Sequence, residues 1–258
     1  MDAYHLPDDL FEFAMIPRVD EVIEKIAGIA EPEDWDYQET PSSRPHPILN
    51  NYLRYTYKKI AQEKKVSVTK DEEWACWNTG LVTDHQEQIY MVFSKNKSDK
   101  FPQYWHHYGF VREGEQQSNR FDQLPEMAHY FDDPSKLVFD THKEVRKNTK
   151  HIVSDNRERF PDMFKGRDQY HLEIVIEGSF KSAIERVKRN YKTAIPQYYN
   201  GAIQMLLPLC LDTPQRADLA LVVEDFESFY RASTCLTLDM AYNNARQIAR
   251  PDRDWLQP

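Results

Sequence analysis

The spacing of apolar residues changes along the chain, and the change predicts where helix gives way to strand. Over residues 47–63 apolar positions recur about every 3.6 residues, the period of an amphipathic helix. Over residues 74–96 the period is two, interrupted by a polar turn near residues 84–88, which predicts two paired strands. A third strand begins near Gln103, and Gly80 inside the first strand indicates a bulge.

The C-terminal half is predicted to contain three further helices and three further strands. A helix is expected over residues 141–159, and another is expected to begin with Ser179 as its N-cap and to end before Pro196. The apolar segments IQMLLPLCL, ADLALVV and STCLTL predict strands. The closing segment TLDMAYNNARQIARP predicts the last helix.

Strands joined by tight turns favour antiparallel pairing over a βαβ unit. We therefore predict an α+β fold with a curved, largely antiparallel sheet and packed flanking helices, and barrel-like closure of that sheet is left open. Residues 1–46 mix short helical pieces with a polar, proline-rich run, and are predicted to form an N-terminal arm or linker. Residues 47–258 are predicted to form a single α+β domain.

Composition narrows the class of function. The net charge of -9 argues against a protein that holds long duplex nucleic acid, so an anionic partner must meet a local basic patch. The sequence has no G-x-G-x-x-G, P-loop or G-x-S-x-G motif, which disfavours Rossmann, Walker-type and α/β-hydrolase chemistry. No pair of His or Cys residues has convincing metal-ligand spacing, so neither a metal ion nor a cofactor is predicted.

The N-terminal segment is acidic and lacks the features of a signal peptide. The longest apolar stretches are far too short to cross a bilayer, so we expect a cytoplasmic protein without a membrane segment. The three cysteines are widely spaced among apolar neighbours, which is typical of buried thiols. The oligomeric state stays open.

The closing helix carries the first candidate for a binding face. At 100° per residue, Asp239, Asn243, Arg246 and Arg250 fall on one stripe, and alanines lie opposite. Asparagine forms helix less readily than Lys or Glu, and two arginines one turn apart can hold a single phosphate. In the alternative, structural interpretation, Asp239 caps the helix and the arginines pair with carboxylates.

A second candidate lies in the segment NTKHIVSDNRERFP. His151 and Asp155, four residues apart on a predicted helix, should lie within hydrogen-bond reach across one turn. A carboxylate in that position can hold the imidazole in one tautomer for acid-base catalysis, so the two residues form the candidate catalytic pair. Arg159 shares their stripe. The alternative is a capping histidine with a surface ion pair.

The third candidate is a local concentration of basic residues over residues 181–192, which includes Lys188 and Lys192. Tyr191, Tyr198 and Tyr199 lie close to them in the sequence. Cations beside aromatic rings suit single-stranded nucleic acid, because phosphates meet the cations and bases stack on the rings. Amphipathic helices also carry such charge without any partner, and both interpretations stand.

Several segments together resemble one known family. They are HPILNNYLRYTYKKI, WNTGL, AHYFDDPSKLVFD, NTKHIVSDNRERFP, RNYKTAIPQYY and LTLDMAYNNARQIARP. The chain is similar to an uncharacterised bacterial domain family of unknown function, which occurs alone or joined to small RNA-binding modules. The resemblance implies a single integral domain and a link to RNA metabolism through the modules that accompany the family.

Three functions follow from these candidates. The favoured one is binding of RNA or a nucleotide-like phosphate ligand, through Arg159, Lys188, Lys192, Gln197, Tyr198, Tyr199, Asn243, Asn244, Arg246 and Arg250. The second is a phosphoester- or nucleotide-processing enzyme in which His151 and Asp155 act with Arg246 and Arg250. The third is a protein-interaction module. A pocket that joins His151 to Arg246 would favour the enzyme, and an open basic groove beside Tyr198 the binder.

Overall fold

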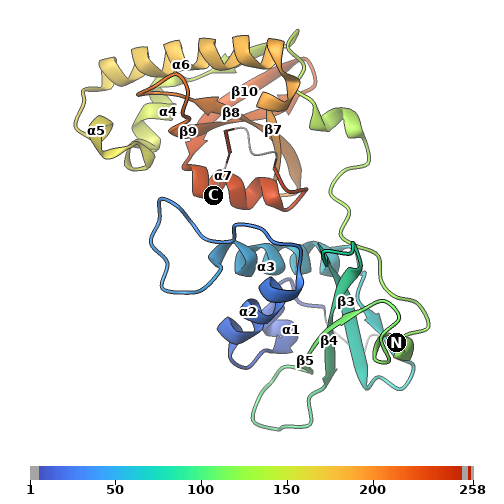
Figure 1. Cartoon of the computed structure of the whole chain (residues 1–258). Helices are drawn as coiled ribbons and strands as arrows, with labels where there is room; N and C mark the ends of the chain where they lie inside the picture. Colours follow the sequence, from blue (N-terminus) through green and yellow to red (C-terminus); the bar gives the residue numbers. More distant parts are fainter. Residues whose placement is uncertain (1–5, 252–254, 257–258) are drawn as a thin grey trace. The chain divides into compact units, whose positions relative to one another are not determined.

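The computed structural model describes residues 6–251 and 255–256. The chain divides into two compact units (Figure 1). The first comprises the described residues up to Tyr37 together with Pro41–His129, and the second comprises Gln38–Thr40 and the described residues from Tyr130 onward. Within the described ranges, no helix combines the length and apolar character needed to span a membrane.

The first unit contains a five-stranded sheet with the order β1-β5-β4-β3-β2. All neighbouring strands in it are antiparallel except the pair β1 and β5. Its elements are α1 (Leu10–Phe13), β1 (Ala14–Met15), α2 (Val19–Ile29), α3 (Pro47–Gln62), β2 (Ser67–Val68), β3 (Trp74–Val82), β4 (Gln88–Lys95), β5 (Trp105–Arg112) and the 3₁₀ turn η1 (Ser118–Arg120). The helix predicted over residues 47–63 and the predicted hairpin of β3 and β4 are confirmed.

Helix α3 buries one of its sides in the core of this unit. Pro47 occupies its first turn, where the fixed φ favours the helix and no N–H is needed. The rings of Tyr57 and Trp77 meet edge to face with their centroids 5.7 Å apart, and both side chains are fully buried. Residues before 47, predicted as an arm or linker, contribute α1, β1 and α2 to the unit.

Gly80 lies at the predicted bulge in β3. The pairing register of β3 with β4 shifts between Asn78 and Val82, and Gly80 has a φ of 71°. A Cβ added there would lie 2.6 Å from the hydroxyl oxygen of Tyr52, which donates a hydrogen bond to the carbonyl of Thr79 at 3.0 Å. A residue other than glycine would be strained in both its backbone and its contacts.

The second unit contains another five-stranded sheet, with the order β6-β10-β9-β8-β7. Among the strands described in this sheet, β6 and β10 pair in parallel and the other neighbours are antiparallel. Its elements are η2 (Pro134–Leu137), β6 (Glu144–Lys147), α4 (Thr149–Asp155), η3 (Arg157–Arg159), α5 (Asp162–Lys165), α6 (Gln169–Arg189), η4 (Tyr191–Thr193), β7 (Ile195–Tyr199), β8 (Ala202–Leu209), β9 (Leu219–Phe226), β10 (Phe229–Leu236) and α7 (Leu238–Arg246).

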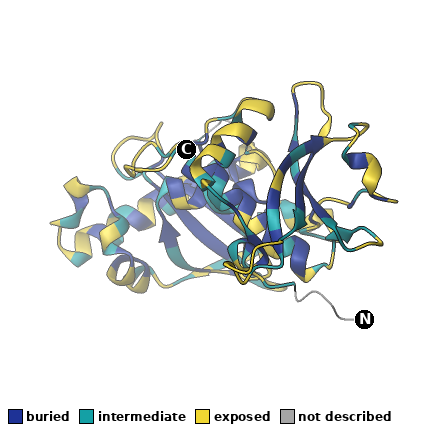
Figure 2. Cartoon of the chain, turned by 90° about the horizontal axis from the view of Figure 1, so that it is seen from below, coloured by how far each residue is buried: buried dark blue, intermediate teal, exposed yellow. Residues whose placement is uncertain are grey.

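The α+β class and the largely antiparallel pairing are therefore confirmed, as are the three predicted C-terminal strands. The strands form two open sheets rather than one, and neither closes into a barrel. Buried residues, most of them apolar, concentrate along the strands and on the inward sides of the helices (Figure 2).

The helix predicted over residues 141–159 is wrong at its beginning. Residues Glu144–Lys147 form the edge strand β6, and α4 begins only at Thr149, where Asn148 caps it by accepting a hydrogen bond from the N–H of His151 at 3.2 Å. The register opposite β10 places Val145 beside Tyr230. Pairing with a strand that lies distant in sequence has overridden the local pattern.

The helix predicted to begin at Ser179 is also wrong at its beginning. Helix α6 is 21 residues long and starts at Gln169, with Asp168 as the N-cap that accepts from the N–H of His171 at 3.0 Å. Ser179 is buried in its interior. Gly178 costs a helix only about 1 kcal/mol relative to alanine, which the packing of a helix this long outweighs.

The second sheet is covered by α6 on one face and by α7 on the other (Figure 1). Ile176 and Val187 of α6 pack with Leu207, Leu221 and Val223 in one apolar cluster. Side chains alternate between the faces of a strand, so the intervening positions of β8 and β9 lie on the face that carries α7. That second face holds most of the candidate residues.

The expectation of buried thiols holds for two of the three cysteines. Cys76 and Cys235 are buried, and Cys210 is partly exposed. Burial raises the pKa of the Cys235 thiol to about 12, so this thiol stays protonated at neutral pH.

Candidate functional site

Helix α7 begins at a threonine cap and ends earlier than the sequence pattern predicts. The side chain of Thr237 accepts a hydrogen bond from the N–H of Met240 at 3.3 Å, so Thr237 rather than Asp239 is the N-cap. The helix ends at Arg246, and Arg250 lies beyond a turn. The predicted helical stripe that reaches Arg250 is therefore wrong. Pro251 disfavours helical backbone at the residue before it.

Asp239 and Asn243 make bonds inside the second unit. The carboxylate of Asp239, which is 3% exposed, accepts hydrogen bonds from the N–H groups of Gln38 at 3.4 Å and Thr40 at 2.9 Å. The side-chain amide of Asn243 donates to the carbonyl of Asp239 at 2.9 Å. Arg246 is almost completely buried. Of the predicted stripe, only Arg250 is exposed to solvent.

Asn244 and Gln197 belong to a row of hydrogen bonds that crosses the second sheet. Asn244 donates to the side-chain oxygen of Gln197 at 3.1 Å, and Gln197 donates to Gln204 at 2.7 Å. Gln204 in turn donates to the carboxylate of Glu224 at 3.2 Å. We call these four residues the amide row. Gln197 is 1% exposed, so its polar groups are used within the fold.

Arg159 connects η3 to β10. One of its terminal nitrogens donates to the side-chain oxygens of Asn156 at 2.7 Å and Thr234 at 3.2 Å, and to the carbonyl of Cys235 at 2.6 Å. Asn156 is itself buried and donates to the carbonyl of Ile152 at 2.9 Å. These bonds account for the presence of an arginine at this position.

His151 and Asp155 make the contact predicted for them. The Nδ1 atom of His151 lies 3.2 Å from a carboxylate oxygen of Asp155, across one turn of α4. The two side chains are 51% and 53% exposed. The pair therefore lies on the surface of a short helix, where solvent reaches both groups.

The basic segment is divided by the end of α6. Lys188 lies in the last turn of the helix and forms an exposed ion pair with Glu185 at 2.8 Å. Lys192 lies after the helix, in the 3₁₀ turn η4. The two tyrosines of β7 differ, because Tyr198 packs its ring against Tyr130 at 4.9 Å whereas Tyr199 is 50% exposed.

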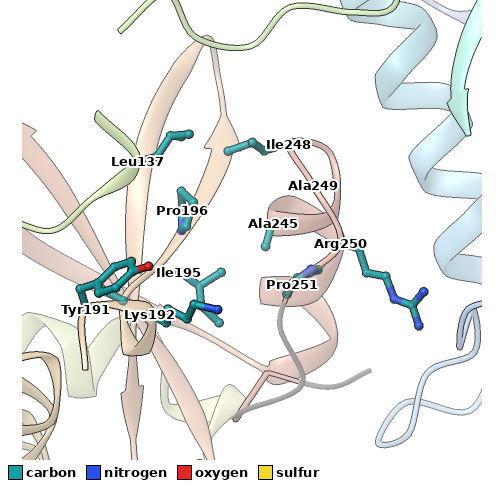
Figure 3. A pocket seen from close by; sticks show the side chains of 11 residues that line it. Leu137, Tyr191, Lys192, Ile195, Pro196, Ala245, Ile248, Ala249, Arg250 and Pro251 are labelled. Atoms are coloured by element: carbon teal, nitrogen blue, oxygen red, sulfur yellow. The ribbon is translucent and has the colours of Figure 1, made fainter. Parts of the chain in front are cut away.

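A pocket of about 260 Å³ opens between η4, the start of β7 and the end of α7. Its polar or aromatic lining consists of Tyr191, Lys192 and Arg250. The apolar lining consists of Leu137, Ala194, Ile195, Pro196, Ala245, Ile248, Ala249 and Pro251. Tyr191 and Lys192 lie on the side of β7, whereas Arg250 lies on the side of α7 and its side chain points away from them (Figure 3).

The pocket brings together two predicted ligand-binding residues from separate segments, Lys192 and Arg250. Both are exposed, and the neighbouring ring of Tyr191 is 62% exposed. His151 and Arg246 are not among the residues that line it. No sequence pattern pointed to Leu137 as part of this site, because it reaches the pocket from a turn ahead of β6.

One family model, described as "Domain of unknown function (DUF3825)", matches residues 26–255 of the chain. The predicted resemblance to an uncharacterised domain family is thus confirmed. Comparisons with curated proteins and with solved structures give no significant match.

Proposed function

Because the chain belongs to this family of unknown function, we propose its function from the chemistry of the pocket: the second unit binds a small phosphate-bearing ligand, such as a nucleotide or the end of an RNA strand. The observation that carries the proposal is that Lys192, Arg250 and Tyr191 line one pocket. The implied link of the family to RNA-binding modules stays a prediction and agrees with this ligand class.

The three groups suit the parts of a nucleotide. A guanidinium presents several N–H groups to phosphate oxygens, and an ammonium adds a second positive charge. The exposed phenol ring of Tyr191 offers a surface on which a base stacks. The apolar lining formed by Ile195, Pro196 and Ile248 suits the flat face of a base rather than a hydrated ion.

The size of the pocket limits the ligand. Its volume of about 260 Å³ lies just below the roughly 300 to 1,000 Å³ of typical small-molecule sites. A single nucleotide with its phosphate at the rim fits this size better than a dinucleotide cofactor. The net charge of -9 also favours a short anion at one local site over a long polyanion spread across the surface.

Binding is supported better than catalysis. The acid-base pair His151 and Asp155 is half exposed on α4 and lies outside the pocket lining. The residues that would surround a phosphate bound by Lys192 and Arg250 therefore do not include His151 or Asp155.

Calorimetric titration with adenosine monophosphate tests the proposal. The double variant Lys192→Gln, Arg250→Gln removes both cations of the pocket and keeps side-chain length. We expect binding to weaken at least tenfold, since charge-assisted hydrogen bonds contribute about 1.5 to 3 kcal/mol each and about 1.4 kcal/mol is a factor of ten.

The matched control is Lys150→Gln, Lys165→Gln, which removes two cations from α4 and α5 of the same unit. Lys165 makes an ion pair with Asp162 in which the aspartate is 95% exposed, so its loss should hardly change stability. The control should bind the nucleotide as the wild type does. Equal affinity of the wild type and the pocket variant, or equal weakening in both variants, would overturn the proposal.

A further inference from the structure

The face of the second sheet that carries α7 ends in a row of exposed side chains. Tyr199 of β7 lies opposite Ala202 of β8, and Phe226 of β9 lies opposite Phe229 of β10. Gln204 of β8 pairs with Glu224 of β9. Ala202 lies two residues before Gln204 and Phe226 lies two residues after Glu224, so in this antiparallel pair Ala202 and Phe226 are neighbours in the next row. Directly opposed residues share a face, and positions two apart on a strand share it as well.

A slot open to solvent lies in this row. Tyr199 is 50% exposed and Phe226 is 43% exposed, and between them stands Ala202, which is exposed and has only a methyl side chain. We call these three residues the aromatic slot. Its walls rise from strands that are separated by one strand, hence about 9.6 Å apart at the backbone.

This width suits one planar ring. Bases stack at about 3.4 Å, so a base between two rings needs about 7 Å from ring plane to ring plane. The backbone separation leaves room for both walls to lean onto a base. An aliphatic side chain would fill the same space without gaining from stacking on the two rings.

Hydrogen-bonding groups stand behind the slot. The amide row runs through the neighbouring row of the sheet, with Gln204 directly behind Ala202 and Glu224 directly behind Phe226. Both side chains are partly exposed. Side-chain amide and carboxylate groups are the partners that proteins offer to the edges of unpaired bases.

Two arginines extend the row of Gln204 and Glu224 towards the edge strand, because Arg231 lies opposite Glu224 and Arg146 lies opposite Arg231. The guanidinium of Arg231 lies 4.9 Å from the ring centre of Phe226, and that of Arg146 lies 4.0 Å from the ring centre of Phe229. The two phenylalanine rings stack at 5.4 Å and 7°. Arg231 also forms an ion pair with Glu224 at 2.7 Å, and Arg146 forms one with Glu144 at 2.9 Å. The two arginine side chains are 53% and 59% exposed, so stacking and ion pairing order them while they still reach solvent.

We propose that the aromatic slot takes one base of a single-stranded RNA, with Arg231 and Arg146 meeting the phosphates of the adjoining nucleotides. The inference rests on the proposed function, because it extends a nucleotide-binding unit into one that holds a strand. Stacking walls, hydrogen-bonding amides and exposed guanidiniums are the combination that binds unpaired nucleotides on a sheet.

Fluorescence anisotropy of a labelled eight-nucleotide oligouridylate, titrated with the full chain, tests the slot. The substitution Ala202→Leu fills the slot and removes no wall, and Tyr199→Ala removes one wall at an exposed position. Each should weaken binding at least about fivefold. The control Tyr170→Ala removes a ring that is 70% exposed on α6, across the sheet, and should bind as the wild type does.

Adenosine monophosphate separates this inference from the proposed function. Ala202→Leu should bind the mononucleotide normally, whereas Lys192→Gln with Arg250→Gln should not. Wild-type affinity for the oligonucleotide in both slot variants would overturn the slot and leave the pocket standing. Absence of oligonucleotide binding by the wild type would also overturn it. Absence of mononucleotide binding by the wild type would overturn the pocket instead.

Discussion

Replacing His107 should remove a defined component of the pH dependence of folding in the first unit. This histidine of β5 is 9% exposed, and its ring lies 5.3 Å from that of Phe110 and 6.0 Å from that of Phe93. Burial, with a smaller contribution from Lys25, lowers the pKa of His107 from 6.5 to about 4. The native imidazole is therefore neutral at every pH above that value.

The sign and magnitude follow from proton linkage. Below pH 6.5 the unfolded chain protonates this histidine and the native unit does not, so the free energy of unfolding falls as the pH falls from 6.5 to 4. Each pKa unit corresponds to about 1.36 kcal/mol, so the full effect is about 3 kcal/mol. Between pH 7 and pH 5 the expected loss from this one group is about 2 kcal/mol.

Urea unfolding at pH 7 and pH 5, followed by tryptophan fluorescence, measures this loss. Trp35, Trp74, Trp77 and Trp105 all lie in the first unit, so the signal reports mainly on it. From pH 7 to pH 5 the free energy of unfolding of the wild type should fall by about 2 kcal/mol more than that of His107→Gln.

The neighbouring substitution His106→Gln is the control. His106 is more exposed than His107, because adjacent residues of β5 alternate between the two faces of the strand. His106 makes the smallest of the three contributions that lower the pKa of His107, so this variant should keep most of the pH dependence of the wild type. An equal loss of unfolding free energy in the wild type and in His107→Gln would refute the reasoning.

Two further substitutions test the packing of each unit by thermal or urea unfolding. Gly80→Ala should destabilise the first unit by about 2 kcal/mol, because of its positive φ and the close hydroxyl of Tyr52; Gly109→Ala, with open space around the new methyl group, should cost less. If the two cost the same, the bulge does not require glycine. Arg159→Met should destabilise the second unit by about 2 kcal/mol, because Asn156, Thr234 and Cys235 lose the hydrogen bonds that Arg159 donates to them. A change no larger than that caused by Arg167→Met at an exposed position would contradict this role.

Elements that form through local contacts could be predicted from the sequence. The period of α3 and the alternation in β3 and β4 are set by residues that are close along the chain, and all three elements were predicted. The strand β6 was missed because its pairing partner β10 lies far along the chain, and a four-residue edge strand carries little pattern of its own.

The candidate site was predicted in its residue types rather than in its geometry. Lys192 and Arg250 were selected for separate reasons, and neither local pattern shows that η4 and the turn after α7 line one pocket. The expected phosphate face of α7 rested on Arg246 and Arg250 sharing a helix, but the helix ends at Arg246. Where a helix ends depends on its tertiary packing as well as on the following proline.

All hydrogen bonds of the amide row run in one donor-to-acceptor direction, and the carboxylate at one end determines that direction. An ionised Glu224 has no proton to donate, so Gln204 must turn its NH₂ group towards it and its oxygen towards Gln197. Gln197 then presents its own oxygen to Asn244. The orientation of the amide on α7 is thereby dictated by a carboxylate two strands beyond β7, and no member can rotate without reversing its neighbours. The carboxylate of Glu224 on β9 thus sets the orientation of every side-chain amide between it and α7, the helix whose end lines the pocket.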